Sequence, residues 1–150
     1  MNVDGKLEVT GLSDVGRKRS HNEDSIASDT GIGLTVLADG MGGYRAGEVA
    51  SAMAVNAIME EVRDGLKLLK KHGDVDEESG FARESLLVRE AVMRANETIH
   101  KAAISQPQCQ GMGTTVVTAM FYDDRMTIAH VGDSRLYRLR SNNFEQITVD

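Results

Sequence analysis

The hydrophobic periodicity of this chain changes from that of strands to that of helices and back, and this order limits the fold more than any other feature. The first part has three short runs that are apolar or alternate every second residue, as strands do, over residues 6–12, 25–29 and 33–39. Strand-like runs return in the last third, over residues 114–122, 126–131, 135–140 and 144–149. Turns are expected at Asp123-Asp124 and Asn142-Asn143.

Between these strand runs the chain predicts two amphipathic helices. The first begins near Gly47 and has an apolar stripe at Ala50, Met53, Ala54, Ala57, Ile58, Val62, Leu66 and Leu69. A charged run over residues 67–78 is expected to end it and to form a loop. The second helix spans about 82–105, with Val88, Ala91, Val92, Ala95, Ile99 and Ala102 on one face, and Pro107 follows it. Strands, a helix pair and further strands favour an α+β fold with helices stacked on antiparallel sheets.

Bulk composition excludes several classes of protein. The formal net charge of −6 argues against general binding of a nucleic-acid backbone. The single cysteine, Cys109, excludes an internal disulfide and a cysteine-based zinc site. No long apolar run is present and the first residues do not resemble a signal peptide, so no membrane segment and a cytoplasmic location are expected.

Acidic residues gather at three predicted strand ends, in HNEDS (21–25), ADG (38–40) and VGDS (131–134). The charge of Asp39, at the end of an apolar run, needs a compensating cation if it is buried. Carboxylates suit hard divalent cations such as magnesium and manganese, and Gly40 leaves its carbonyl open as a further oxygen ligand. Arg19, with Arg17 and Lys18, lies beside the first cluster, and a guanidinium matches phosphoryl oxygens.

Each cluster alone also fits ordinary turn chemistry, in which Asp, Asn and Gly shape loops without binding anything. His21 and His130 are both poor ligand candidates. His130 in particular shares a strand face with apolar residues. The GMGG run at 40–43 is not a nucleotide-binding P-loop, since it lacks the Gly-Lys-Ser/Thr ending. The three clusters together with an arginine favour a metal-assisted phosphate site over the turn interpretation.

Four linked motifs carry a family resemblance: SDVGRKRSHNEDS, VLADGMGGYRAGEVAS, GMGTTVV and AHVGDSRLYRLR. In order and spacing the chain resembles, from Glu8 onward, the metal-dependent protein phosphatases of type 2C (the PPM family) in their bacterial form. The resemblance implies a layered α-β-β-α sandwich of antiparallel sheets with flanking helices. Residues 1–150 would be the N-terminal portion of one phosphatase domain, truncated on its C-terminal side.

The resemblance also implies roles for single residues. Asp39 matches an aspartate that bridges two metal ions, Gly40 a glycine whose carbonyl binds one of them, and Arg19 the arginine that holds the substrate phosphate. Glu23 matches an acid that holds a metal through water, and Asp24 matches the neighbour that supports it. Asp133 matches an aspartate at a third and weaker metal site. Thr114 and Thr115 match residues that hydrogen-bond beneath the site. Glu48 is instead expected in the first helical turn, where an acid favours the helix dipole.

The implied activity is hydrolysis of phosphoserine and phosphothreonine in proteins by a water activated by two Mn²⁺ or Mg²⁺ ions, with a third at Asp133. The substrates would be phosphoproteins of a cognate serine/threonine kinase. No phospho-enzyme is needed and Cys109 has no role. Some family members have a histidine after the ADG motif. Here the residue is Met41, so a metal-bound water or another group must protonate the leaving group.

Two other classes remain open: a truncated pseudophosphatase that binds phosphoproteins, and a regulatory domain that only pairs with partners. Arg19, Glu23, Asp39 and Asp133 together favour the enzyme, because a pure binder has no use for metal-binding carboxylates. The isolated 150-residue chain is expected to be inactive, since the family's domain continues beyond this length and supplies two further metal-binding aspartates.

Overall fold

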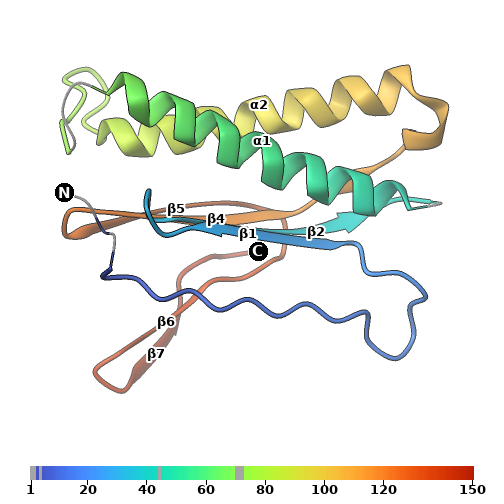
Figure 1. The fold of residues 1–150 in the computed structure, drawn as a ribbon, viewed down its shortest axis with the longest axis horizontal. Coiled ribbons are helices and arrows are strands. Elements are labelled where there is room, and N and C mark those ends of the chain that lie inside the picture. The colour runs from blue at the N-terminus through green and yellow to red at the C-terminus, as the bar shows by residue number, and fades with distance from the viewer. Residues whose placement is uncertain (1–2, 4, 44, 70–72) are drawn as a thin grey trace.

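Two helices cover one face of an antiparallel sheet in the computed structural model, which describes residues 3, 5–43, 45–69 and 73–150. The helices α1 (Ala46–Leu68) and α2 (Arg83–Ser105) lie antiparallel and side by side above the sheet (Figure 1). A short 3-10 helix, η1 (Pro107–Cys109), ends the helical part. Both predicted helices are thus confirmed, including Glu48 in the first turn of α1. Residues 70–72 of the expected charged loop lie outside the described residues.

The sheet has five strands. Its order is β1 (Asp24–Asp29), β2 (Leu34–Met41), β4 (Val116–Tyr122) and β5 (Arg125–Val131), and the short β3 (Gly113–Thr114) pairs with the end of β2. A separate hairpin of β6 (Tyr137–Arg140) and β7 (Asn143–Gln146) lies on the side away from the helices (Figure 1). Every strand pair is antiparallel, which confirms the α+β class and its helix-on-sheet layering.

The core lies between the helices and the sheet. Alternation along β2 buries Leu34, Val36 and Ala38 on the helix side and leaves Thr35 and Leu37 on the other. The predicted helical stripes supply the facing residues, of which Ala50, Ala54, Ile58, Val62, Val88, Ala91, Ala95 and Ile99 are buried. This packing fixes the start of α1 over the end of β2, where the acidic residues gather.

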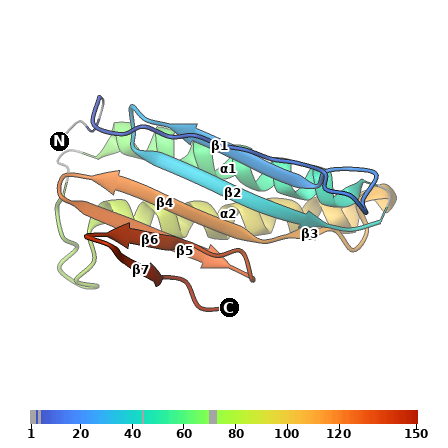
Figure 2. The ribbon, with the colours of Figure 1, turned by 90° about the horizontal axis from the view of Figure 1, so that it is seen from below.

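The predicted strand at 6–12 is wrong. Residues 7–15 are extended but belong to no sheet; they run across the outer face of the sheet, along β1, rather than beside its edge (Figure 2). The segment lies close to β1 at Gly11, where a Cβ would be only 2.5 Å from the Cδ1 atom of Ile26. The alternating pattern reports an extended segment, and only the tertiary contacts decide whether it finds a hydrogen-bonding partner.

Several strand boundaries also differ from the prediction, two of them near features that matter for the site or its turns. The second hairpin turns at Ser141-Asn142, both with positive φ (50° and 60°), so that Asn143 already belongs to β7. The strand β2 continues past Asp39 to Met41, because β3 pairs with its last two residues. Asp39 therefore lies inside a strand, on its exposed side, and the expected burial of its charge is wrong.

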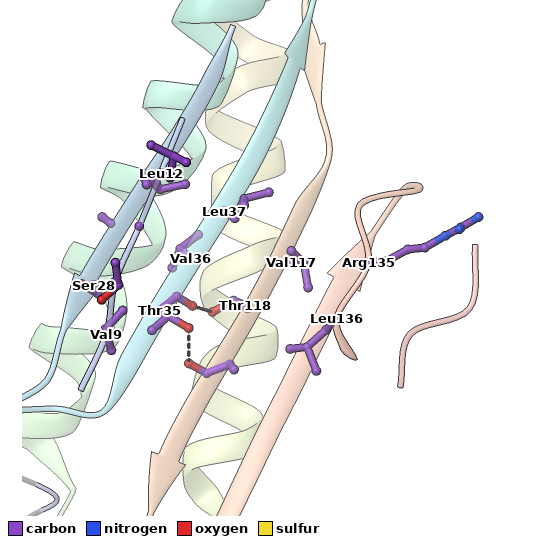
Figure 3. A pocket seen from close by; sticks show the side chains of 15 residues that line it. Val9, Leu12, Ser28, Thr35, Val36, Leu37, Val117, Thr118, Arg135 and Leu136 are labelled. Carbon is purple, nitrogen blue, oxygen red and sulfur yellow. Dashed lines mark hydrogen bonds between the residues drawn. The ribbon is translucent and has the colours of Figure 1, made fainter. Parts of the chain in front are cut away.

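The outer face of the sheet forms a groove with a volume of about 720 Å³ between the N-terminal segment and the start of the β6–β7 hairpin (Figure 3). Val9 and Leu12 border it on one side and Arg135 and Leu136 on the other. On its floor, Thr118 Oγ1 donates to the carbonyl of Thr35 at 2.8 Å, which satisfies a buried hydroxyl. The described residues place no helix on this side.

Among the described residues, neither long helix is apolar enough to cross a lipid bilayer.

Candidate functional site

The backbone of Asp39 is held by Thr115. The Asp39 amide donates to Thr115 Oγ1 (3.0 Å) and the Thr115 amide donates to the Asp39 carbonyl (2.9 Å). Thr115 Oγ1 also lies 2.6 Å from Ser134 Oγ, in the loop after β5. Thr114 pairs with Gly40 in the neighbouring register position. These bonds fix the direction in which the Asp39 carboxylate leaves the sheet.

The start of α1 approaches the end of β2 so closely that only glycines fit. A Cβ on Gly40 would lie 1.9 Å from the carbonyl oxygen of Gly47 and 2.8 Å from that of Glu23. A Cβ on Gly47 would lie 2.6 Å from Glu23 Oε1, so the Glu23 carboxylate rests against the first turn of α1. The Gly40 amide donates to the Glu23 carbonyl at 3.0 Å. The two glycines thereby bring Glu23, β2 and the helix start together.

Three carboxylates meet at this end of the sheet. Asp24 and Asp39 are direct partners across β1 and β2, so both side chains lie on the same face, and Glu23 is the residue before Asp24. Desolvation raises the pKa of Asp24 above its ordinary value of 3.8. The charge of Asp39, a hydrogen bond with Asp39 and the charge of Glu23 act in the same direction. The cluster is therefore electrostatically unfavourable when no cation is present.

This cluster gives a pH-dependent prediction for the metal-free chain. A raised folded-state pKa means that Asp24 contributes stability below its unfolded-state pKa and loses it as the pH rises through the folded-state pKa. Asp24→Asn should therefore raise the melting temperature by roughly 1–3 °C at neutral pH, and this gain should vanish near about pH 3. Thermal melts of both proteins at the two pH values, with Asp124→Asn as the exposed control, check it. A gain that is the same at both pH values would contradict the electrostatic cause.

Arg19 lies in a loop before β1 that is closed by local hydrogen bonds. Asn22 Nδ2 donates to Ser13 Oγ at 2.6 Å, and the Asp24 amide donates to Asn22 Oδ1 at 3.0 Å. The loop lies at the end of the sheet where α1 begins (Figure 1). Arg19 lines a cavity of about 310 Å³ there, together with Ser20, His21, Glu23, Gly42 and Arg45. The structure thus brings the predicted arginine and Glu23 to one cavity.

Asp133 is exposed in the loop after β5. Its neighbour Ser134 hydrogen-bonds to Thr115, which holds Asp39, so Asp133 lies at the same end of the sheet but does not line the arginine cavity. His130 hydrogen-bonds through Nε2 to the Val149 carbonyl at 2.9 Å, and this contact supports its expected structural role. Cys109 is buried in the helix–sheet core.

The donor set suits a hard cation. Asp39, Asp24 and Glu23 offer carboxylate oxygens, and Gly40 has no side chain to shield its carbonyl. Within the described part of the chain, no three His, Cys, Asp or Glu side chains are already arranged around a common metal position. Mg²⁺ in proteins uses one or two carboxylates and keeps several waters, so it does not need three such side chains around one position. The residues present therefore fit part of a divalent-cation site.

Two residues that contribute to the site were not predicted from the sequence. Arg45 had no predicted role, because a single basic residue in a glycine-rich loop forms no pattern. Ser134 was grouped only as part of the VGDS cluster, and its bond to Thr115 joins segments 19 residues apart. The AGE run after Arg45 was the available signal for Arg45, since it places that residue directly before a helix.

Oxygen donors beside an arginine-lined cavity suit a protein that handles phosphoryl groups with divalent cations, and similarity to known proteins leads to the same class. The model of the protein phosphatase 2C family matches residues 15–150, and the chain belongs to this family. The resemblance inferred from the four motifs is thereby confirmed.

Curated proteins and solved structures agree with this assignment. The chain is 38% identical over 145 residues to the serine/threonine protein phosphatase PstP of Mycobacterium tuberculosis, covering 96% of this chain and 25% of PstP. It is 37% identical over 142 residues to the serine/threonine phosphatase stp of Listeria welshimeri, covering 92% of this chain and 52% of that protein. The solved catalytic domain of PstP in complex with two manganese ions is similar with a TM-score of 0.74 and 36% identity, over 91% of this chain and 53% of that one. The chain thus spans a quarter to about half of the length of these proteins.

Proposed function

We propose that this chain is the part of a protein serine/threonine phosphatase that binds divalent cations and the substrate phosphate. The observation that carries the proposal is the convergence of Asp39, Gly40 and Glu23 at one end of the sheet with an arginine-lined cavity beside them. Membership of the protein phosphatase 2C family and the manganese ions in the PstP structure support Mn²⁺ or Mg²⁺ as the cation.

The residues divide the work by their chemistry. The Asp39 carboxylate and the Gly40 carbonyl would bind the cations directly, Glu23 and Asp24 would accept hydrogen bonds from waters around them, and Asp133 would serve a third, weaker site. When bound, such cations lower the pKa of water and polarise phosphoryl oxygens.

Arg19 would hold two phosphoryl oxygens with its planar fork and offset the charge that develops on them. Thr115 keeps the Asp39 backbone in place throughout. Met41 has no proton to give, so a water at the cations or another group would protonate the leaving alkoxide.

The substrates in this proposal are phosphoserine and phosphothreonine proteins of a cognate serine/threonine kinase, and the protein works in the cytoplasm. The names of PstP and stp support the residue class of the substrate. The lone, buried Cys109 agrees with a reducing compartment.

The decisive experiment measures manganese-dependent release of phosphate from a phosphothreonine peptide by a complete protein phosphatase 2C domain that contains these residues. Turnover that is abolished by a metal chelator supports the enzyme. Peptide binding without turnover would instead favour the pseudophosphatase. If the domain neither binds nor hydrolyses the peptide, the regulatory domain would be the remaining alternative. The 150-residue chain alone should give no turnover, because its described residues supply only part of a cation site.

Arg19→Ala in that complete domain should lower kcat/KM for phosphopeptides by about 10- to 150-fold, because a charge-assisted hydrogen bond contributes roughly 1.5–3 kcal/mol. Manganese affinity, measured by calorimetry, should change little, since Arg19 binds phosphate and not the cation. Arg17→Ala, in the same exposed loop, is the matched control. If Arg17→Ala shows the loss and Arg19→Ala does not, the assignment of the phosphate ligand is wrong.

A further inference from the structure

Arg45 occupies a position where its residue type does not favour the fold. It is the residue directly before α1, has left-handed backbone angles (φ 70°, ψ 12°) and makes no side-chain capping hydrogen bond. Such positions favour Asn, Asp, Ser, Thr or Gly, and the left-handed region is unfavourable for residues with a long side chain. A cation also sits badly at the positive end of a helix dipole. Unfavourable backbone positions that persist in proteins cluster at binding sites.

The side chain of Arg45 lines the same cavity as Arg19. Among the described acidic residues, none forms an ion pair with either arginine. The two arginines belong to different segments, the loop before β1 and the loop between β2 and α1. Glu23 is the one carboxylate among the described residues that line this cavity, so the two arginines leave it with a net positive charge, which anionic groups of a ligand would balance.

The cavity has room for more than one anionic group. Its volume of about 310 Å³ is roughly ten times the ~30 Å³ that one water occupies in the liquid. Arg19 is in the segment that leads into Glu23 and Asp24, so it is the arginine placed for the phosphoryl group next to the cations. Arg45 comes from another segment, between Gly42 and α1, and is available for a second group. A guanidinium binds a carboxylate or a phosphate equally well through two parallel hydrogen bonds.

We propose that Arg45 binds an acidic group that flanks the phosphorylated residue, so that the protein prefers phosphopeptides with a neighbouring carboxylate or second phosphate. This inference rests on the proposed function and names its substrate class. A chain with a net charge of −6 repels acidic peptides in general, whereas Arg17, Lys18, Arg19 and Arg45 concentrate positive charge near the arginine cavity.

The first test compares two phosphoserine peptides, one with glutamates and one with glutamines beside the phosphoserine, in a complete phosphatase domain. The ratio of kcat/KM for the acidic peptide to kcat/KM for the neutral peptide should fall about tenfold in Arg45→Gln, mainly through a higher KM for the acidic peptide. Arg45→Lys should keep part of the preference for the acidic peptide. Arg83→Gln, which removes an exposed arginine at the start of α2, is the matched control and should leave the ratio unchanged.

A second measurement needs no catalysis. In the metal-free 150-residue chain, Arg45→Asn should raise the melting temperature by about 2–4 °C, because asparagine tolerates the left-handed backbone better than arginine does. The same variant should lose the calorimetric preference for the acidic peptide over the neutral one. A lower melting temperature together with an unchanged preference would mean that Arg45 serves the fold.

An equal loss of kcat/KM for both peptides in Arg45→Gln would overturn the flanking assignment, because it would place Arg45 on the phosphoryl group itself. No loss with either peptide would overturn it as well. Failure of the proposed function is recognised separately: the unaltered domain would then not hydrolyse p-nitrophenyl phosphate, whereas the binding preference of the 150-residue chain would still test Arg45.

Discussion

Asp39→Asn in a complete protein phosphatase 2C domain carrying this chain is expected to lower manganese-dependent hydrolysis of a phosphopeptide by about 10³-fold or more. Substitution of residues that merely support metal ligands already costs about 10- to 100-fold in metal affinity or activity. Asp39 is proposed to bind both cations, so the neutral amide weakens two sites at once and removes the charge that balances them. The measurements are kcat/KM at saturating manganese and manganese affinity by calorimetry.

The fold should survive this substitution, which separates a chemical role from a structural one. Both hydrogen bonds between Asp39 and Thr115 use the Asp39 backbone, and asparagine keeps them. The variant also removes the like-charge contact with Asp24, so the metal-free melting temperature should stay the same or rise slightly. Asp124→Asn, in the turn between β4 and β5 with a 95% exposed side chain, is the control for both measurements. Near-normal turnover by Asp39→Asn would exclude its proposed role.

The sequence predicted well those parts of the fold that depend on local patterns. The helical stripes of α1 and α2 were predictable because burial of one helix face repeats every three to four residues, and the same residues form the core. The strand expected over 6–12 failed because alternation is a local signal, whereas pairing depends on a neighbour far along the chain. Residues 7–15 run along β1 on the outer face of the sheet and pair with no strand.

The site was predictable as a set of motifs but not as a geometry. Family motifs pointed to Asp39, Gly40, Glu23 and Arg19, yet the continuation of β2 past Asp39 depends on β3, some 70 residues away. The alternation along β2 places Asp39 on the exposed side of the strand, whereas the apolar run before it suggested burial. Arg45 could not be predicted, because its significance lies in its backbone angles and in the cavity that it shares with Arg19.

Gly40→Ala should damage both the fold and the site, which the sequence pattern alone would not suggest for so small a change. The new Cβ would lie 1.9 Å from the Gly47 carbonyl oxygen and 2.8 Å from the Glu23 carbonyl oxygen, and both obstacles are backbone atoms that no side-chain rotation can clear. The start of α1 must therefore move away from β2. Overpacking of this kind usually costs about 1–3 kcal/mol and occasionally more, and backbone contacts this short place Gly40→Ala at the upper end.

At about 2–4 °C per kcal/mol for a chain of this size, the melting temperature should fall by roughly 6–12 °C. Manganese affinity should fall with it, because the displaced segment contains the Gly40 carbonyl and the backbone contact to Glu23. Gly43→Ala provides a close control: it is the same substitution three residues along, where a Cβ would meet no atom within 4 Å. Equal melting temperatures for Gly40→Ala and Gly43→Ala would show that the close contact between β2 and α1 does not exist in solution. The cation site would then have to be built without it.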